Sequence, residues 1–412
     1  MPTISSLLVH RDGDRSNHNM KTIFWLSVGA VAYTYFGYVV YLWLRKQFWS
    51  KPVCKAAFEP TVSVILVVHN EEARLPDKLR NLQSMEYPHS KLEIIVASDA
   101  STDRTDAMVA AMWPSGSLCV QLVQCPVRCG KSAALAKAIA VARNEILLFT
   151  DARQMIEPGA LGELVANFAD SSVGCVSGEL MLRTAQGGTS GGISVYWRFE
   201  KTVRKLEASV GSTVGATGAL YAARRLCVVP PPDGTLLDDV YIPVHVARQG
   251  LRVVFEPAAR AWDDVTGKKN ELRRKVRTLA GNYQLLELAP WLLAEANPVR
   301  VGFIHHKLFR LLVPFLLLAA VSANLALVGD PVYVGLLTLQ ALFYFAALAG
   351  LLLPRQLVPR ICAAASAFVL LNAAAFLAPF HYLRYKNDPT QLWCLTNTAS
   401  VRQNSATGGL DR

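Results

Sequence analysis

The sequence predicts a doubly wound, mostly parallel α/β domain joined to several membrane-spanning α-helices. Between residues 61 and 152, β-branched apolar runs alternate with helical segments, which is the pattern of parallel strands connected by crossover helices. Apolar stretches of bilayer length lie on both sides of this region. The 412 residues are 52% hydrophobic and 18% charged, which is more apolar than a soluble domain of this size.

The first apolar stretch, residues 23–44, contains no charged residue and is followed at once by Arg45 and Lys46. A cleaved signal peptide is the alternative, but its apolar part would be shorter, and no small-x-small cleavage site follows Leu44. We therefore expect a retained anchor. Three further spans are expected at residues 309–328, 332–353 and 361–380. The expected segments are a tail (1–22), the anchor (23–44), the α/β domain (45–270), amphipathic interface helices (271–300), three transmembrane helices (301–383) and a second tail (384–412).

Basic residues set the expected orientation. They cluster at 45–55 before the α/β domain and at Arg300, Lys307 and Arg310 after it, so the positive-inside rule places the domain in the cytoplasm, at the inner cell membrane. The two basic tails would then lie outside, which conflicts with the rule, but we give the loops more weight. The net charge of +11 suits a membrane surface and a polyanionic ligand such as a nucleotide sugar.

Two classes of partner are not expected. No basic stripe is interleaved with aromatic residues, so nucleic acid is the weaker interpretation of the charge. The eight cysteines are scattered, and Cys125 and Cys129 lack further cysteines or histidines at zinc-site spacing. We expect neither a structural metal nor disulfides.

The α/β domain begins with four expected strands, which are near-continuous apolar runs of the kind that parallel sheets bury on both faces. The strands lie at residues 61–70, 92–101, 118–124 and 145–152, with helices at 71–85, 103–113 and 131–144. Ligands bind beyond the carboxyl ends of such strands. Polar residues follow all four strand ends: His69, Asn70 and Glu71, then Asp99, then Lys131, then Asp151. Each alone could be a turn residue or a helix cap, and Lys131 could be a solvated first-turn lysine.

Gly130, Lys131 and Ser132 resemble the end of a nucleotide-binding P-loop. The first glycine of that motif is replaced by Cys125, and Pro126 removes a backbone amide that phosphates would need. An ATPase loop is therefore disfavoured, and a lysine at the start of a helix needs another explanation.

Seven segments in order are similar to the membrane-bound family 2 glycosyltransferases, the group of hyaluronan, cellulose and poly-N-acetylglucosamine synthases and related lipid-linked enzymes. They read VSVILVVHNEE, IIVASDASTDRT, RCGKSAALAKAIAVA, LLFTDAR, GATGALYAARR, LLDDVYIPVHVARQGLRVVFEP and ELRRKVRTLAGN. The resemblance implies a GT-A fold and an inverting transfer from a nucleotide sugar, expected to be a UDP-sugar. The implied acceptor is a polysaccharide or a lipid-linked saccharide, with the bilayer and polysaccharide-export proteins as partners.

The same resemblance assigns the donor site. Asp151 takes the first position of the family's Asp-x-Asp motif, which holds Mg²⁺ or Mn²⁺ against the diphosphate. The second position is Arg153, which can neutralise phosphate directly, so the metal is either held by Asp151 alone or matters less. The other implied nucleotide-sugar contacts are His69, Asn70, Glu71, Asp99 and Lys131.

Catalysis is implied for an acidic pair and a basic helix. Asp239 would accept the proton of the acceptor hydroxyl with Asp238 in support, although acids also favour the first turn of a helix. Arg277 matches the arginine of the family's Gln-x-x-Arg-Trp motif, where it would steady the leaving diphosphate. Arg274 stands for the glutamine and Thr278 for the tryptophan, which argues against long processive synthesis. The same segment also reads as a basic amphipathic helix on anionic lipid.

The acceptor region is expected at residues 196–225. Tyr196 and Trp197 could stack on a sugar, although aromatic residues at helical spacing are equally expected in a core. By resemblance, Gly215, Thr217 and Gly218 belong to a loop that approaches the transferred sugar, as glycine permits. Trp262 is a candidate for the acceptor entrance.

Three other functions remain as alternatives. The first is transfer of a single sugar to polyprenyl phosphate or another lipid, which the missing tryptophan favours. The second is an inactive assembly subunit, which only Arg153 supports. The third is a transporter, which the spans disfavour because they contain few polar groups beyond Asn324 and Asn372.

Overall fold

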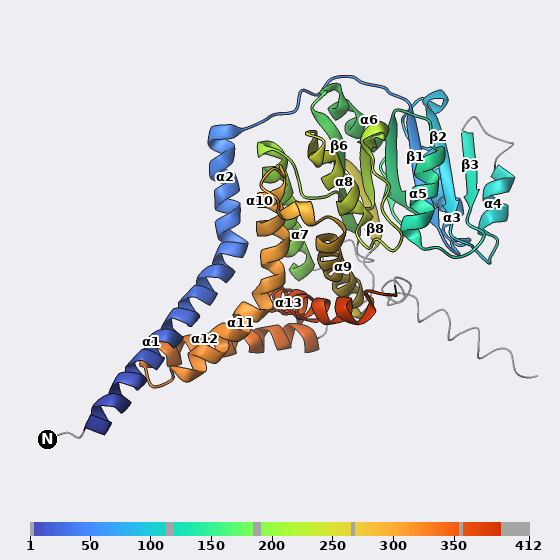
Figure 1. Ribbon diagram of the computed structural model, residues 1–412. Coiled ribbons are helices and arrows are strands. Elements are labelled where there is room, and N and C mark those ends of the chain that lie inside the picture. Colours follow the sequence, from blue (N-terminus) through green and yellow to red (C-terminus); the bar gives the residue numbers. More distant parts are fainter. Residues whose placement is uncertain (1–3, 113–118, 184–190, 265–267, 354–356, 389–412) are drawn as a thin grey trace, which may run out of the picture.

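The computed structural model describes residues 4–112, 119–183, 191–264, 268–353 and 357–388. It consists of an eight-stranded sheet with helices on both faces and a group of long helices beside it (Figure 1). The strand order is β3-β2-β1-β4-β7-β6-β8-β5.

The first four strands are parallel, as the sequence predicts. They are β1 (Val62–Val68), β2 (Leu92–Ser98), β3 (Cys119–Gln124) and β4 (Ile146–Asp151). Their connections contain α3 (Leu75–Gln83), α4 (Thr105–Met112) and α5 (Lys131–Val141). The register pairs Val68 with Ser98, Ser98 with Gln124 and Val67 with Asp151, so the four carboxyl ends meet at one edge of the sheet.

The second half of the sheet is mixed. β7 (Leu220–Arg224) lies antiparallel between β4 and β6 (Val173–Arg183), and β8 (Arg252–Asp264) runs parallel to β6. The two-residue β5 (Met155–Ile156) pairs antiparallel with β8. The expectation of a mostly parallel sheet therefore holds for the first four strands, and the sheet as a whole is mixed.

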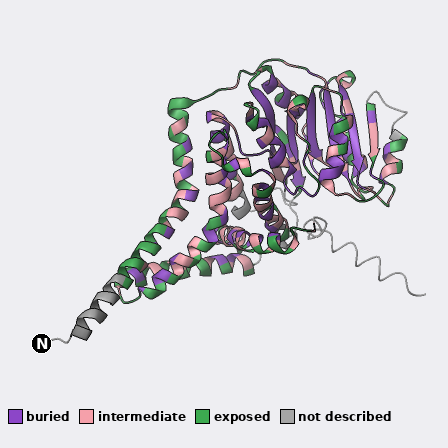
Figure 2. Ribbon diagram, viewed as in Figure 1, coloured by how far each residue is buried: buried purple, intermediate pink, exposed green. Residues whose placement is uncertain are grey.

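Helices cover both faces of the sheet, which explains the continuous apolar strands. Alternate residues of β1 point to opposite faces: Val64 packs with Leu79, whereas Ile65 packs with Leu135. Figure 2 shows the strands buried and the long N-terminal helix largely exposed. The remaining elements of this region are α6 (Ala160–Val165), α8 (Asp238–Arg248) and the 3₁₀ turns His89–Lys91, Ala166–Ala169, Arg225–Cys227 and Pro290–Leu293.

Among the residues that the structure describes, four helical segments are long and apolar enough to cross a membrane: Ser16–Trp49, Arg300–Ala326, Pro331–Leu352 and Arg360–Tyr385. Each of the four overlaps an expected span over most of its length. The first joins α1 (Ile4–Ala32) to α2 (Tyr38–Trp49) through a π-helical turn at Tyr33–Gly37. The second joins α10 (Arg300–Gly302), the π-helical turn η6 (Phe303–Leu308) and α11 (Phe309–Ala326). The others are α12 (Pro331–Leu352) and α13 (Arg360–Tyr385).

Two helices connect the sheet to these spans. α7 (Gly191–Val210) packs against α2 and α13, and α9 (Lys268–Leu288) packs against α13. In Figure 1, α9 lies between the sheet and α13. The segment expected to lie at the interface thus contacts a helix of the candidate membrane spans.

Candidate active site

Asp99 organises the turn before α5. Its carboxylate accepts hydrogen bonds from the backbone N–H of Cys129 at 2.7 Å and of Gly130 at 3.0 and 3.1 Å. Gly130 has φ of +86°, a conformation that glycine adopts without strain. His69 Nδ1 donates to the Asp99 carbonyl oxygen at 2.7 Å. The ends of β1 and β2 therefore fix the position from which Lys131 starts its helix.

Asn70 and Glu71 lie at the rim of this edge. The Asn70 side chain accepts from the backbone N–H of Thr102 at 2.8 Å, and its own φ is +54°. Glu71 forms an ion pair with Arg74 at 2.9 Å. The exposed Asn70 side chain therefore links the loops after β1 and β2, whereas the Glu71 side chain pairs within its own segment.

Lys131 joins two carboxylates that are far apart in sequence. Its Nζ lies 3.1 Å from Asp151 Oδ1 and 3.3 Å from Asp238 Oδ2. Burial lowers the pKa of Lys131, but the two carboxylates outweigh burial and hold that pKa well above its usual range. The Gly-Lys-Ser sequence is thus explained by an ion-paired lysine, and the interpretation of Lys131 as a solvated residue is wrong.

Asp238 and Asp239 form the first turn of α8, so the structural explanation of this acidic pair also holds. Asp238 is buried, and Asp239 is half-buried against Gly218. A Cβ atom at Gly218 would lie 3.1 Å from Asp239 Oδ2, and Ala216 N–H donates to the Asp239 carbonyl oxygen at 2.7 Å. Burial and the neighbouring Asp238 raise the pKa of Asp239 to about 6. A carboxyl group with such a pKa is suited to accept a proton near neutral pH.

Arg277 reaches the acidic cluster from α9. Its charge interacts with Asp151, Asp238 and Asp239, while burial and the adjacent Arg274 lower its pKa. The expected pair Arg274 and Arg277 is therefore brought to the site by a helix that also contacts the spans.

Arg153 and Trp262 are engaged elsewhere. Arg153 Nη2 lies 2.6 Å from Asp263 Oδ2, and Asp263 is 3% exposed. Trp262 Nε1 donates to Glu157 at 2.7 Å, and the guanidinium of Arg183 lies 4.6 Å from the Trp262 ring centroid. The structure therefore gives both expected site residues partners around β8, and neither lines the pocket described next.

A small pocket of about 10 Å³, partly open to solvent, lies beside Thr217. Trp197 and Thr217, both expected in the acceptor region, line it. Tyr196 does not, although its ring centroid is 6.2 Å from that of Trp197 and the Lys275 ammonium lies over both rings. The other lining residues are Glu179, Leu180, Glu200, Lys201, Arg204 and Phe255. Its walls combine an aromatic ring with hydrogen-bonding groups, which suits a hydroxylated ligand.

Lys78 was missed by the sequence analysis. It is fully buried on α3, and its Nζ donates to Thr150 Oγ1 at 2.9 Å and to the Gln154 carbonyl oxygen at 2.6 Å. Lys78 thereby holds both sides of the loop that carries Asp151. Its spacing from the buried residues Leu75, Leu79 and Leu82 places it on the apolar face of the helix. This spacing is the sequence feature that indicates a buried lysine.

Asp99 also meets the cysteine pair. The potential ligand atoms of Asp99, Cys125 and Cys129 lie within 4.8 Å of one another, a proximity that the spacing of the cysteines alone did not indicate. Burial, together with Cys125 and Asp99, raises the pKa of Cys129 to about 12, which keeps this thiol protonated. In this cluster the Asp99 carboxylate already accepts hydrogen bonds from the backbone N–H groups of Cys129 and Gly130.

Residues 63–223 match the family model described as glycosyl transferase family 2. The chain is 26% identical to the probable glycosyltransferase YdaM of Bacillus subtilis over 215 residues, which is 50% of each chain. It is 24% identical to a poly-β-1,6-N-acetyl-D-glucosamine synthase of Staphylococcus epidermidis over 232 residues, which is 55% of each. The chain thus spans about half the length of these curated relatives.

Among solved structures, the chain is similar to the mannosyltransferase PcManGT of Pyrobaculum calidifontis, which was determined with GDP-Man and Mn²⁺. The TM-score is 0.67 at 24% sequence identity, and the match covers 88% of this chain and 99% of the other. This likeness confirms the expected GT-A fold.

Proposed function

We propose that the protein transfers a sugar, with inversion, from a nucleotide sugar to a saccharide or lipid-linked saccharide, because residues 63–223 match the glycosyl transferase family 2 model. The proposed donor is a UDP-sugar, and the proposed location is the cytoplasmic face of the inner membrane. One observation carries this proposal: Asp151, Asp238, Asp239, Lys131 and Arg277 converge at the carboxyl edge of the parallel strands.

The donor occupies the edge formed by β1, β2 and α5. The loops that His69 and Asp99 hold together face the nucleoside, and the two cations Lys131 and Arg277 face its diphosphate. Fixed positive charges stabilise a diphosphate as it leaves, and they need no rearrangement at that moment.

Asp151 and Asp238 are the residues that would hold a divalent cation. Their carboxylates already share one positive charge, the Lys131 ammonium, at 3.1 and 3.3 Å, and carboxylate oxygens are the ligands that Mg²⁺ and Mn²⁺ prefer. Mn²⁺ is also bound in the structure of the similar mannosyltransferase. Such an ion would neutralise the negative charge of the diphosphate. Arg153, which is paired with Asp263, is not part of this set.

Asp239 is the proposed base. It lies against Gly218, next to the pocket lined by Trp197 and Thr217. An acceptor hydroxyl in that pocket would give its proton to Asp239 as its oxygen attacks the anomeric carbon. One base on the face opposite the leaving group is what an inverting transfer needs.

Transfer of a single sugar to polyprenyl phosphate or another lipid is the second candidate. Thr278 is exposed on α9, and its hydroxyl donates to the Arg274 carbonyl oxygen, so this position offers no ring for a long saccharide to stack on. Polysaccharide-export proteins are partners only under the first candidate. An inactive subunit would not need to retain the cluster of acids and cations.

The test is release of nucleoside diphosphate by the purified protein in nanodiscs, with a panel of nucleotide sugars and with or without Mg²⁺ or Mn²⁺. Asp239→Asn should abolish release, whereas the control Asp77→Asn, on the exposed face of α3, should not. No release from any donor, with membrane extract supplied as acceptor, would favour the inactive subunit.

A further inference from the structure

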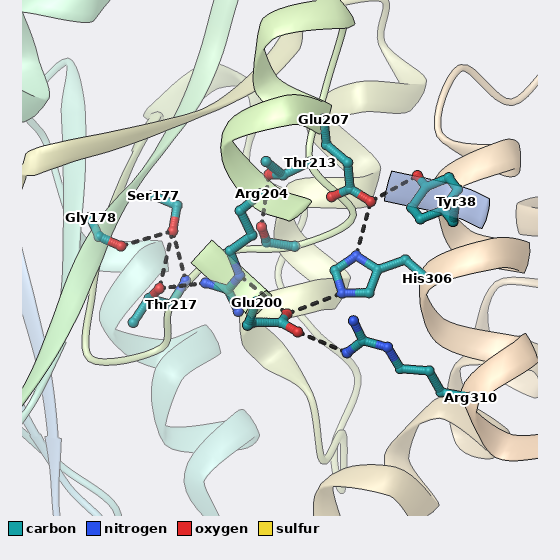
Figure 3. A network of polar contacts seen from close by, with 11 residues as sticks. Tyr38, Ser177, Gly178, Glu200, Arg204, Glu207, Thr213, Thr217, His306 and Arg310 are labelled. Carbon is teal, nitrogen blue, oxygen red and sulfur yellow. Dashed lines mark hydrogen bonds and ion pairs between the residues drawn. The ribbon is translucent and has the colours of Figure 1, made fainter. Parts of the chain in front are cut away.

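A polar network connects α2, α7 and the helical segment that begins at Arg300 (Figure 3). Its members come from three helical segments: Tyr38 from α2, Glu200, Arg204 and Glu207 from α7, and His306 and Arg310 from η6 and α11. Two of these segments belong to candidate membrane spans. The proposed function above assigns no chemical step to any of the six residues, although Glu200 and Arg204 line the acceptor pocket.

His306 is clamped between two carboxylates. Its Nδ1 lies 2.9 Å from Glu207 Oε1, and its Nε2 lies 3.1 Å from Glu200 Oε1. All three side chains are buried. Tyr38 donates to Glu207 at 3.0 Å, so α2 is hydrogen-bonded to one of the two carboxylates that contact His306.

Glu200 is the centre of the network. Besides His306, it accepts from Arg310 Nη1 at 2.8 Å, and Arg204 Nε lies 3.5 Å from its Oε1. Burial alone would raise the pKa of Glu200, but His306 and Arg310 hold it well below its usual range. An ionised and buried carboxylate is costly to leave unpaired, which makes these contacts a strong constraint on geometry.

Arg204 links Glu200 to the loop at the candidate active site. Its Nη1 donates to Thr217 Oγ1 at 2.6 Å, and Thr217 N–H donates to Ser177 Oγ at 2.9 Å. The next residue, Gly218, faces the Asp239 carboxylate. Arg204 and Thr217 also line the acceptor pocket together.

We propose that Arg204 is a positioning residue that fixes the Thr217–Gly218 segment against Asp239 on the acceptor side, and that the span beginning at Arg300 fixes Arg204 through Glu200. This inference rests on the proposed function. It assigns the membrane helix a second task besides anchoring, which is to keep the acceptor side of the site in order.

The planar guanidinium is needed because it contacts Glu200 through Nε and Thr217 through Nη1. Lysine keeps the charge but offers one compact ammonium group, which cannot reproduce both contacts. Arg204→Lys should therefore raise the acceptor KM about tenfold, with the donor KM within about twofold of the original. More of the donor sugar should end on water instead of the acceptor, because the loop no longer orients the acceptor hydroxyl.

The experiment uses the full chain in nanodiscs, the labelled donor selected by the panel above and total bacterial membrane extract as acceptor. Arg225→Lys is the matched control, because that guanidinium donates to the Asn144 carbonyl oxygen at the opposite edge of the sheet. Thr217→Val should repeat the effect of Arg204→Lys, and Thr217→Ser should restore the original acceptor KM.

The outcomes are distinguishable. If the unmodified protein turns over no donor, the proposed function fails first. If it is active and Arg204→Lys behaves like Arg225→Lys, or if Thr217→Val leaves the acceptor KM unchanged, the positioning role is overturned. If Glu200→Gln raises the acceptor KM as Arg204→Lys does, the link to the membrane span is supported. If Glu200→Gln leaves the kinetics unchanged, that link is refuted.

Discussion

Asp239 shows how one residue acquires its chemistry from its neighbours. Acids at the start of a helix usually remain ionised, since the helix N-terminus favours negative charge. Here burial and Asp238 act in the opposite direction and raise the pKa of Asp239 to about 6. The sequence identified the acidic pair, and the folded environment suits one member of that pair to act as a base.

The pH dependence of transfer follows from this pKa. Protonated Asp239 cannot accept the acceptor proton, so kcat/KM should fall about tenfold for each unit of pH below about 6 and level off above it. Initial rates between pH 4.5 and 8 test this prediction, with thermal unfolding recorded at each pH to exclude acid denaturation. A rate that is flat across pH 6 would contradict the role of Asp239.

Lys78 makes a prediction about stability. Burial lowers the pKa of Lys78 to about 7 from 10.5, so the unfolded chain binds more protons than the folded chain between these pH values. Stability from this group should therefore rise as pH increases from about 7 towards 10. The Tm of the original protein relative to that of Lys78→Met should therefore rise with pH over this range, as measured by thermal unfolding in detergent. A difference independent of pH would show that Lys78 is not buried in this way.

At the scale of elements, the active site is a junction between a loop and a helix. The loop of residues 215–218 packs against the first turn of α8, and glycine at position 218 leaves room for the Asp239 carboxylate. Lys131, at the start of α5, pairs with Asp238 at the start of α8. The first turns of α5 and α8 and the loop of residues 215–218 thus bring the proposed donor side and the proposed acceptor side together.

Gly218→Ala tests this junction. The added Cβ would lie 3.1 Å from Asp239 Oδ2, so the carboxylate must move or the loop must shift. We expect kcat to fall at least about tenfold, because small displacements of a reacting group are costly. Gly162→Ala, in α6 with open space around its Cβ, is the matched control and should retain activity. Equal activity of both variants would contradict the close packing at Gly218.

At the scale of the whole molecule, the spans and the sheet form one continuous structure. α13 packs against both α7 and α9, the helices that carry Arg204 and Arg277. The helices expected to lie in the bilayer therefore also support both sides of the site.

The orientation of the molecule can be tested by labelling of cysteines. If the sheet domain is cytoplasmic, a membrane-impermeant maleimide should label the exposed Cys54 only after the cells are permeabilised. Gly329→Cys, in the turn between α11 and α12 with open space around it, should be labelled in intact cells. Mass spectrometry of the labelled peptides measures both sites. The reverse pattern would invert the orientation that the positive-inside rule predicts.

Much of this architecture was predictable because its signals are local. The β-branched runs gave the four parallel strands, and the lengths of the apolar stretches gave the four candidate spans. The resemblance to family 2 glycosyltransferases is confirmed by the family match. The roles of the individual site residues stay predictions.

The rest could not be predicted because it depends on pairs far apart in the chain. Arg153 was expected at the donor phosphates and instead pairs with Asp263, 110 residues later. The antiparallel placement of β7 between β4 and β6 also has no local signature. His306 falls within the region expected to form transmembrane helices. Its contacts with Glu200 and Glu207, which are about 100 residues earlier, connect this region to α7.

The sequence by itself determined the strands, the spans and the edge at which polar residues gather. These properties follow from periodicity and apolar length, which act within one element. Only the tertiary structure decided which charges pair: Lys131 with Asp151 and Asp238, and Arg204 between Glu200 and Thr217. The physical reason is that ion pairs and hydrogen bonds need contact within a few ångströms, and that contact exists only after the elements have packed.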